Sequence, residues 1–520
     1  MNEIISSKII IHKISQDGLF IGEDASMYFI NSPDYLYFKL FKRNLNPKKN
    51  RIIVSSDYPG DKIELYIIIK EFLRKMKLKI EENNKRIDKA NFTEIKWIIT
   101  VPPLWDIKGK NLMEKAAKKA QMVNLEILLE PEAVSLAIFN EENPIIKRNI
   151  HPGKKFLIVD AGGYTVDFSA NKILENNNLE QLMIPTSIVN GSSIINERIF
   201  ELVEGFIGKN KVEEYKKSNY KIINNILSSI EEKKKEINHN QAGFFKLDIS
   251  GFDLYCPNDN LLGKAFDKVF GAKSYFAKKE CEKEIQGQKL IFNNKELFIP
   301  KKYVYDIIHQ VAVNIQNYIN SILAKIGSVD LIVFTGGFSN NIIFRNYIKK
   351  NSEGNLAEIA FLENPQMSVM KGAALFGLNP SQIIKRIIPI TIGVYSTRER
   401  KDNEDTCYGK YINEKYEIRC HDYLQYVQRR QSIDVNKIIR YKIYPIDEKI
   451  IIYYTYDKEI NEENKVELGY INIPVGVIPI NQRSFILSMK FSNYINVTLT
   501  DETLDSENTV LLSYPRNKFF

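Results

Sequence analysis

The feature of the sequence that most constrains the fold is the run FLIVDAGGYTVDF at residues 156–168. Four consecutive apolar residues, 156–159, are typical of a short strand that is buried on both faces. This strand ends at Asp160, and Gly162 and Gly163 separate it from a second run with high β-propensity. The pattern predicts two short strands joined by a tight glycine turn.

The residue types around this turn suit binding to a phosphate chain. Glycines let backbone N–H groups approach phosphate oxygens closely, and the Thr165 hydroxyl offers one more donor. Carboxylates such as Asp160 and Asp167, one in each strand, are able to hold a hydrated Mg²⁺ ion. An ordinary hairpin with a glycine-rich turn explains the same residues, so these residues alone leave both interpretations open.

Composition places the chain among ordinary globular proteins. Its 520 residues are enough for two or three domains, and its 44% hydrophobic and 26% charged residues are typical of such proteins. The formal charge of +9 comes from 73 basic and 64 acidic residues. Because lysine runs such as 233–235 have glutamates beside them, we expect a solvated helix face and no nucleic-acid partner.

Cysteine spacing and hydropathy exclude further classes. Cys256, Cys281, Cys407 and Cys420 form no CxxC pair, so we expect no cysteine metal site. Lys8 interrupts the N-terminal segment before a signal-peptide core forms. No run approaches the roughly 18 apolar residues of a membrane span. The expectation is a cytoplasmic protein with no membrane partner.

The hydrophobic pattern along the chain predicts an α/β part up to about residue 385 and a β-rich part from 386 to 520. The segment 245–302 is predicted to be irregular, with a closing hairpin over Asn293 and Asn294. Predicted helices cover about 62–82, a segment capped by Asp106, 192–237, and Tyr303–Lys325 with Gly327 as its C-cap. Predicted strands include 97–101, 127–129, 331–334, 450–456 and 485–491.

Five motifs follow one another in a fixed order: TVPP, LEPEA, DAGGYTVD, FTGGFSN and MKGAALFG. This order resembles the nucleotide-binding domain of the heat shock protein 70 family, in the actin-like ATPase superfamily with its ribonuclease H-like fold. The divergent heat shock 70 kDa protein 12 type is the most similar branch. The resemblance covers residues 19–385 and continues more faintly into the tail. It implies a two-lobed nucleotide-binding domain, N-terminally incomplete, at 1–385, and a smaller substrate-binding-type β domain without a helical lid at 386–520.

The resemblance also implies a role for each matching residue. ATP or ADP and Mg²⁺ are the implied cofactors. Asp160 and Asp167 would hold Mg²⁺ through waters, Gly162 and Gly163 would contact the phosphates, and Thr165 would lie beside the terminal phosphate. Glu130 would orient the attacking water, because in-line attack needs a carboxylate there.

Further matches are less distinctive. Gly336 and Gly337 match the turn under the adenosine, and Pro102 and Lys110 match an interdomain relay that senses nucleotide. Glu231 and Lys234 match the pair that holds the ribose and adenine, although a solvated helix face explains them equally well. Lys42 is a possible counterpart of the catalytic lysine.

Several positions depart from the family pattern. The family has an Asp/Gly-Thr-Thr hairpin near its N-terminus, and no such hairpin precedes residues 19–25 of this sequence. Two explanations are open: the gene model is truncated, or the protein has lost half of its phosphate clamp. Tyr164 replaces the third glycine of the turn, where a positive φ would be costly for it. Phe338 and Asn340 stand where small polar and basic residues normally face the adenine.

The sequence therefore predicts an ATP-binding, chaperone-like protein with slow or impaired hydrolysis, with polypeptide clients or co-chaperones as possible partners. A non-catalytic interaction module with the same fold is the main alternative. A small-molecule kinase of the superfamily and an actin-like filament are further alternatives. The tail would either bind extended peptides by strand addition or serve as a structural cap.

Overall fold

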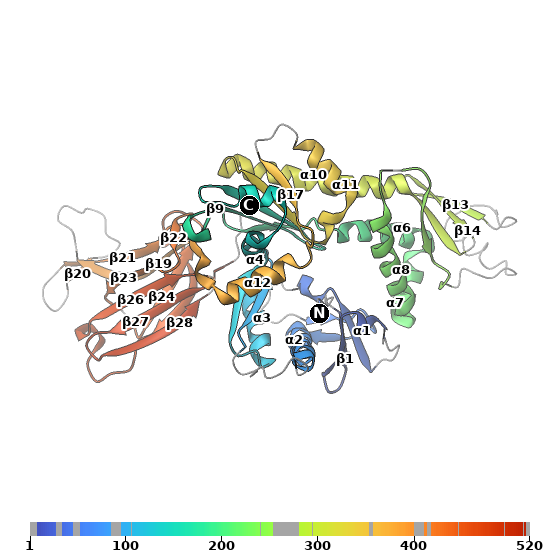
Figure 1. The fold of residues 1–520 in the computed structure, drawn as a ribbon. Helices are drawn as coiled ribbons and strands as arrows, with labels where there is room; N and C mark the ends of the chain where they lie inside the picture. Colours follow the sequence, from blue (N-terminus) through green and yellow to red (C-terminus); the bar gives the residue numbers. More distant parts are fainter. Residues whose placement is uncertain are drawn as a thin grey trace.

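The computed structural model of the chain is a mixed α/β structure (Figure 1). It describes residues 8–27, 34–44, 53–84, 95–105, 107–239, 241–252, 280–293, 295–352, 357–399, 410–412, 418–445, 447–492, 494–512 and 514–515. The mixed α/β class predicted from the sequence is confirmed and is consistent with an actin-like fold. The two-lobed arrangement of its first part stays a prediction.

A central sheet carries the DAGG and FTGG motifs side by side. Its strand order is β17-β16-β8-β9-β10-β18-β22. β11 pairs with the beginning of β9, next to the glycine turn. β8 and β16 run parallel, whereas β8 and β9 form the antiparallel hairpin predicted from the glycine turn. The strands are β8 (Lys155–Ala161), β9 (Val166–Ile173), β10 (Leu179–Gln181), β11 (Thr186–Ile188), β16 (Leu331–Thr335), β17 (Glu358–Phe361), β18 (Ile383–Ile387) and β22 (Ser432–Asp434).

Helices on this sheet position the ends of its strands. The predicted long helix is α10, and Gly327 ends it with φ 82°, as expected for a glycine C-cap. α4 and α12 cross so closely that a Cβ at Gly372 would lie 1.7 Å from the Ala133 carbonyl oxygen. The helices are α4 (Glu130–Ala137), α5 (Pro144–Asn149), α10 (Lys301–Ile326), α11 (Ile342–Asn351) and α12 (Ser368–Leu378), with the 3₁₀ turns η3 (Ile138–Asn140), η4 (Glu175–Asn177), η6 (Gly337–Asn340) and η7 (Pro380–Gln382).

The N-terminal part has its own core, in which β1 to β3 pack with α2 and α3. β6 and β7 are parallel strands joined by α3, and β6 is the strand predicted before the TVPP motif. Asp106, the predicted cap of α3, lies outside the described residues. The elements are β1 (Lys8–His12), β2 (Gly18–Ile21), α1 (Gly22–Met27), β3 (Tyr35–Lys39), η1 (Phe41–Asn44), β4 (Ile53–Ser55), β5 (Lys62–Glu64), α2 (Leu65–Asn84), β6 (Trp97–Val101), α3 (Ile107–Lys119) and β7 (Leu125–Leu129).

The segment 245–302 was predicted to be irregular, but its described residues 245–252, 280–293 and 295–302 contain four strands, so for them that prediction was wrong. Residues 253–279 and Asn294, part of the predicted closing hairpin, lie outside the described residues. Its strand order is β12-β15-β14-β13, and alternate residues of β12 are buried against neighbouring helices. The predicted helical stretch 192–237 is confirmed. The elements are α6 (Ser193–Ile207), α7 (Lys209–Ser218), α8 (Tyr220–Lys233), η5 (Lys234–Glu236), β12 (Phe244–Asp248), β13 (Glu280–Ile285), β14 (Gln288–Asn293) and β15 (Glu296–Pro300).

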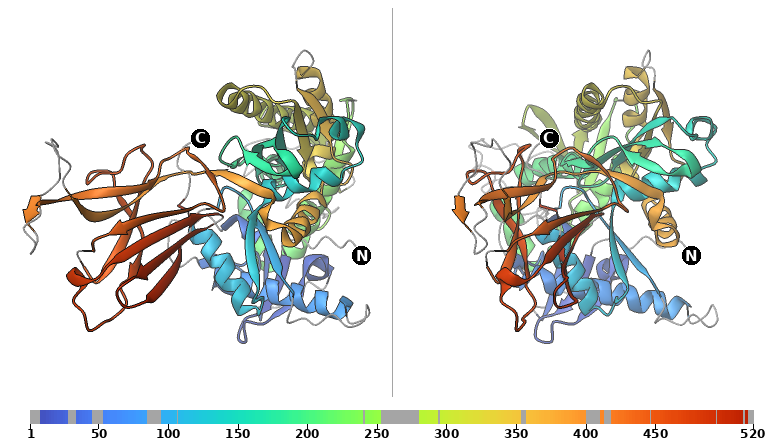
Figure 2. Two further views of the ribbon diagram at one scale, coloured as in Figure 1. Left: turned by 60° about the vertical axis from the view of Figure 1, so that its left-hand side comes forward. Right: turned by 90° about the vertical axis from the view of Figure 1, so that its left-hand side faces the viewer.

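From residue 388 onward the described chain is β-rich and projects to one side of the rest (Figure 2). Two sheets, β20-β21-β19-β24-β25 and β23-β26-β27-β28, share one apolar core. The domain boundary near 385 stays a prediction. β22, which follows that boundary, pairs with β18 of the central sheet, so the two parts share a sheet there. The elements are β19 (Thr391–Glu399), β20 (Lys410–Ile412), β21 (Ile418–Val427), β23 (Ile438–Ile443), β24 (Lys449–Thr455), β25 (Val466–Asn472), η8 (Ile480–Gln482), β26 (Phe485–Phe491), β27 (Ile495–Asp501) and β28 (Ser506–Leu512).

Among the described residues, no helix combines the length and the apolar character needed to cross a membrane.

Candidate functional site

Three carboxyl groups gather where the central hairpin meets the first turn of α4. Asp160 and Asp167 are direct cross-strand partners on β8 and β9. Glu130, the first residue of α4, shares a hydrogen bond with Asp167. Asp160 is 7% exposed and Asp167 2% exposed, so water screens their charges poorly.

Burial raises the pKa values of all three groups. It raises the pKa of Asp160 to about 7, and the nearby Glu130 adds to the rise. The pKa of Asp167 is raised well above its ordinary value by burial and by the charges of Glu130 and Asp160. Burial also raises the pKa of Glu130, while the positive charge of Lys42 opposes that rise. Such a cluster is suited to a bound cation, which would relieve the repulsion.

Three buried oxygens at the cluster and in the loop over the turn have no hydrogen bond of normal geometry within the described chain: Asp167 Oδ1, Ser187 Oγ and Ser193 Oγ. The other Asp167 oxygen, Oδ2, accepts a hydrogen bond of 3.4 Å from the Thr165 hydroxyl. Ser187 lies opposite Asp167 on β11, and hydrogen bonding by its hydroxyl lowers the pKa of Asp167, so the chain itself supplies part of the missing pairing. A ligand at the turn would satisfy the remaining polar atoms.

The glycine turn is held by a loop that sequence reasoning missed. The N–H groups of Gly191, Ser192 and Ser193 donate to the carbonyls of Tyr164, Gly162 and Gly163, at 3.0, 3.1 and 2.7 Å. A Cβ at Gly191 would lie 2.5 Å from the Gly163 carbonyl oxygen, so only glycine allows this approach. The turn therefore has its carbonyls fixed toward this loop, which precedes α6.

The N–H groups of the turn differ in what they are able to bind. The Gly162 N–H donates within the turn, to the Thr165 carbonyl at 3.1 Å. Gly163 is exposed at the tip, and a Cβ placed on it would contact nothing within 4 Å. Of the two predicted phosphate contacts, Gly163 is thus the more open to a ligand.

The FTGG motif abuts the carboxylate cluster. Thr335, at the end of β16, pairs with Asp160, and Gly336 follows with φ 82°. A Cβ at Gly336 would lie 2.3 Å from Asp160 Oδ1, so both the backbone conformation and the contact require glycine. Gly337 opens the 3₁₀ turn η6, where Gln366 Nε2 would lie 3.5 Å from a Cβ placed on it.

The structure shows how the residues that depart from the family pattern, at position 164 and at positions 338 and 340, fit into the fold. Tyr164 does not have the positive φ that a tyrosine would adopt only at a cost, so the predicted backbone penalty does not arise. Phe338 is 5% exposed and packs on Phe344, with ring centroids 5.0 Å apart. Asn340 accepts a hydrogen bond of 2.7 Å from Arg345 Nη2.

The predicted Glu231–Lys234 pair reaches the loop that covers the turn. Lys234 Nζ donates to the Ser192 carbonyl at 3.2 Å and to Glu231 Oε2 at 2.7 Å. Glu231 also accepts a hydrogen bond from Asn196 of α6. Lys234 is 5% exposed, and burial lowers its pKa. A solvated helix face therefore does not describe Lys234.

The cationic turn η1 faces the same site from the N-terminal part. Lys42, which is exposed, acts electrostatically on Glu130. The guanidinium carbon of Arg43 lies 4.7 Å from the centroid of the Tyr164 ring. Sequence reasoning proposed Lys42 and missed Arg43, for which no motif gave a signal.

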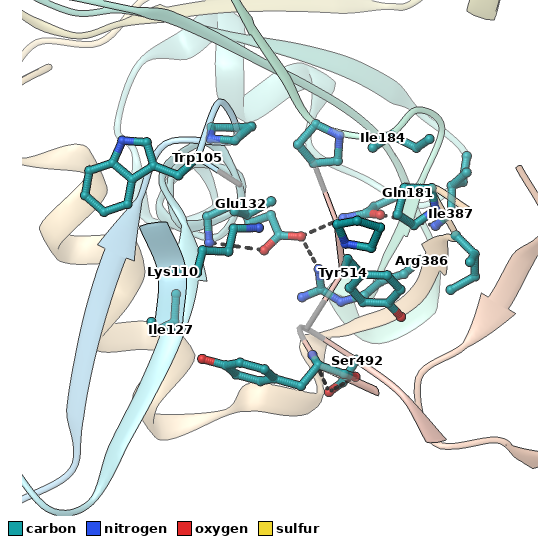
Figure 3. A pocket seen from close by; sticks show the side chains of 17 residues that line it. Trp105, Lys110, Ile127, Glu132, Gln181, Ile184, Arg386, Ile387, Ser492 and Tyr514 are labelled. Carbon is teal, nitrogen blue, oxygen red and sulfur yellow. Dashed lines mark hydrogen bonds and ion pairs between the residues drawn. The ribbon is translucent and has the colours of Figure 1, made fainter. Parts of the chain in front are cut away.

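A separate cavity of about 90 Å³ lies at the junction with the β-rich part (Figure 3). Lys110 and Pro103 line it, next to Arg386 and residues of the C-terminal sheets. Glu132 forms a buried ion pair with Arg386 and accepts a hydrogen bond of 2.7 Å from Gln181. Pro102 lies next to this lining, and its carbonyl accepts from the Trp105 N–H at 3.2 Å. The relay role of Pro102 and Lys110 stays a prediction.

The described residues fit a hydrated cation better than a directly ligated one. No group of three or more His, Cys, Asp or Glu side chains in the described part of the chain is arranged to hold a metal ion directly. Mg²⁺, which keeps several of its waters when bound, needs only one or two carboxylates. Asp160 and Asp167, paired across the hairpin at the base of the glycine turn, suit that mode.

Comparison with known proteins gives matches over most of the chain. No family model matches it. Human heat shock 70 kDa protein 12A is 21% identical over 496 residues, which cover 82% of this chain and 70% of that protein, and the mouse protein matches equally. Human heat shock 70 kDa protein 12B is 20% identical over 427 residues, covering 69% of this chain and 60% of that protein. The resemblance predicted from five motifs is thus confirmed: the chain is similar, at a distance, to heat shock 70 kDa proteins 12A and 12B.

Proposed function

We propose that this chain is a chaperone-like protein that binds ATP or ADP together with Mg²⁺ and hydrolyses ATP slowly or not at all. The observation that carries the proposal is the buried carboxyl cluster of Glu130, Asp160 and Asp167 beside a glycine turn. Similarity to heat shock 70 kDa protein 12A supports the same assignment.

Each group has a task that its position suits. Asp160 and Asp167 would orient the waters of the cation, and the exposed Gly163 N–H would face a phosphate oxygen. Bound Mg²⁺ and ATP would supply the phosphoanhydride bond and the positive charge that neutralises the cluster. Lys234, fixed on the Ser192 carbonyl, would lie at the side of the site predicted for the ribose.

The proposal of slow hydrolysis is supported by the turn itself, where Tyr164 stands in place of the glycine of the family pattern. A carboxyl group orients a water for in-line attack only when it is ionised. Burial raises the pKa of Glu130, and the positive charge of Lys42 opposes that rise. A bound cation would favour the ionised form further.

Titration calorimetry with Mg²⁺ and ADP tests the binding. Asp160→Asn removes one charge from the cluster and is expected to weaken binding at least about tenfold, since charge-assisted contacts contribute about 1.5–3 kcal/mol. Asp306→Asn is the matched control, because Asp306 forms an exposed ion pair with Lys302 on α10. No binding to the unmodified chain would refute the proposal.

A non-catalytic nucleotide or protein-interaction module is the second candidate, favoured by the bulk of Tyr164 at the turn and by Phe338 in the core. Single-turnover phosphate release separates the two candidates. Release that exceeds the buffer rate and is lost in Glu130→Ala would exclude the non-catalytic module.

Polypeptide clients or co-chaperones as partners, and a cytoplasmic location, are part of the same proposal. The partners are proposed from the similarity to heat shock 70 kDa proteins 12A and 12B, and the location from the sequence pattern alone. Pull-down of unfolded model polypeptides with and without ADP tests the client part, and equal recovery by heat-denatured protein would refute it.

A further inference from the structure

Arg43 joins three segments that are far apart in the sequence. It lies on η1, and its guanidinium stacks on the Tyr164 ring of the glycine turn at 4.7 Å. Its Nη1 donates to Glu197 Oε1 of α6 at 2.8 Å. The positive charge of Arg43 is therefore held at the edge of the candidate phosphate site.

The hydrogen bonding of this guanidinium is incomplete. Arg43 Nε is buried and has no hydrogen-bond partner in the described chain. An unpaired buried donor is costly, and one on a charged group more so. An acceptor supplied by a ligand would satisfy this donor.

A purely structural tie explains these contacts less well. Glu197 is 54% exposed, and exposed ion pairs contribute little to stability. A structural tie would also gain nothing from a buried donor without a partner. The neighbouring Lys42 acts electrostatically on Glu130, so η1 presents two adjacent cations to the site.

We propose that Arg43 is a phosphate-recognition residue of this site, positioned by Tyr164 and paired with Glu197 until a phosphate replaces that carboxylate. The proposal rests on the proposed nucleotide-binding function and names the group that reads the phosphate. Arginine suits this role because its planar fork makes two parallel hydrogen bonds to a phosphate while its face rests on an aromatic ring. In this proposal Tyr164 is a positioning residue, because its ring orients the Arg43 guanidinium and a glycine at the same position has no side chain to do so.

The test is to measure, by calorimetry, binding of ADP, adenosine and pyrophosphate to the full chain and to Arg43→Met, with Mg²⁺ present. We expect Arg43→Met to weaken ADP and pyrophosphate binding about tenfold or more, as the loss of a charged hydrogen bond predicts. Adenosine binding should not change, because adenosine lacks the phosphates. Arg198→Met is the matched control, since Arg198 lies on the same helix as Glu197 and forms an exposed ion pair with Glu201.

Three further variants separate phosphate recognition from a structural tie. Tyr164→Phe keeps the aromatic face and should bind ADP as the unmodified chain does, whereas Tyr164→Leu should bind it several-fold more weakly. Glu197→Gln frees the guanidinium and should leave ADP affinity unchanged or raise it. A structural tie predicts the opposite, that Glu197→Gln weakens ADP and adenosine binding as much as Arg43→Met does.

The outcomes also distinguish this inference from the proposed function. Binding of pyrophosphate but not of ADP would refute nucleotide binding and support the role of Arg43, provided that Arg43→Met abolishes it. Binding of ADP with equal affinity by the unmodified chain and Arg43→Met would overturn only this inference. Binding of neither ligand by the unmodified chain would overturn both.

Discussion

At the scale of single residues, Asp160 connects the chemistry of the site to the stability of the protein. The folded protein keeps the Asp160 proton up to about pH 7, whereas an ordinary aspartate releases it near pH 3.8. Between these values the folded state binds more protons than the unfolded state, so the free energy of unfolding decreases as the pH rises. The contribution of Asp160 is fully present below about pH 3.8 and is lost as the pH passes 7.

This argument predicts a pH-dependent difference between the unmodified chain and Asp160→Asn, which does not titrate. In Mg²⁺-free buffer, the free energy of unfolding of the unmodified chain minus that of the variant should decrease from pH 5 to pH 7, by up to about 1.4 kcal/mol per pH unit. Urea unfolding at several pH values measures it. Asp306→Asn should show no such trend, and a flat difference for Asp160→Asn would mean that Asp160 is ionised throughout.

At the scale of elements, the crossing of α4 and α12 fixes Glu130. Gly372 of α12 meets the backbone of Ala133 on α4, less than one helical turn after Glu130, the first residue of that helix. Because both backbones are in contact, neither helix is able to shift without moving the other. The MKGAALFG motif therefore positions a carboxylate that it does not contain.

Gly372→Ala should consequently destabilise the protein, by about 1–3 kcal/mol as overpacked cores do. It should also weaken ADP binding, because α4 carries Glu130. Gly377→Ala lies in the same helix, where the new Cβ would come no closer than 3.4 Å to Ile98 Cγ1. That variant should be stabilised by up to about 1 kcal/mol, the ordinary gain of alanine over glycine in a helix. Urea unfolding of both variants checks the prediction, and equal effects would contradict it.

The elements also show which features the sequence was able to predict. β26 alternates buried and partly buried residues along FILSMKF, and this local pattern predicted the strand correctly. β12 also has buried residues at every second position, but its partner β15 lies about fifty residues further along the chain. No local sequence pattern predicted that pairing. Arg43 and Tyr164 are separated by more than a hundred residues, so their contact became visible only with the fold.

At the scale of the whole molecule, two links hold the β-rich part to the central sheet. β22 extends that sheet by pairing with β18, where Arg386 lies opposite Ile433. The Arg386 side chain then reaches Glu132 in the first turn of α4 (Figure 3). The first turn of α4 therefore carries two carboxylates with different surroundings. Glu130 lies at the candidate nucleotide site, and Glu132 lies at the junction with the β-rich part.

Arg386→Met should therefore loosen this junction. The change leaves Glu132, which is 2% exposed, without its cation, and breaking a buried ion pair in this way costs about 3–5 kcal/mol. Lys385→Met is the matched control, because Lys385 pairs with Glu180 at 3.5 Å from a position whose side chain is 42% exposed, and such pairs contribute about 0–1 kcal/mol. Urea unfolding measures the cost, and hydrogen exchange of the β18 and β22 amides locates it. If the two variants unfold alike and both strands keep their protection, the ion pair does not hold the junction, and the pairing of β18 with β22 is sufficient.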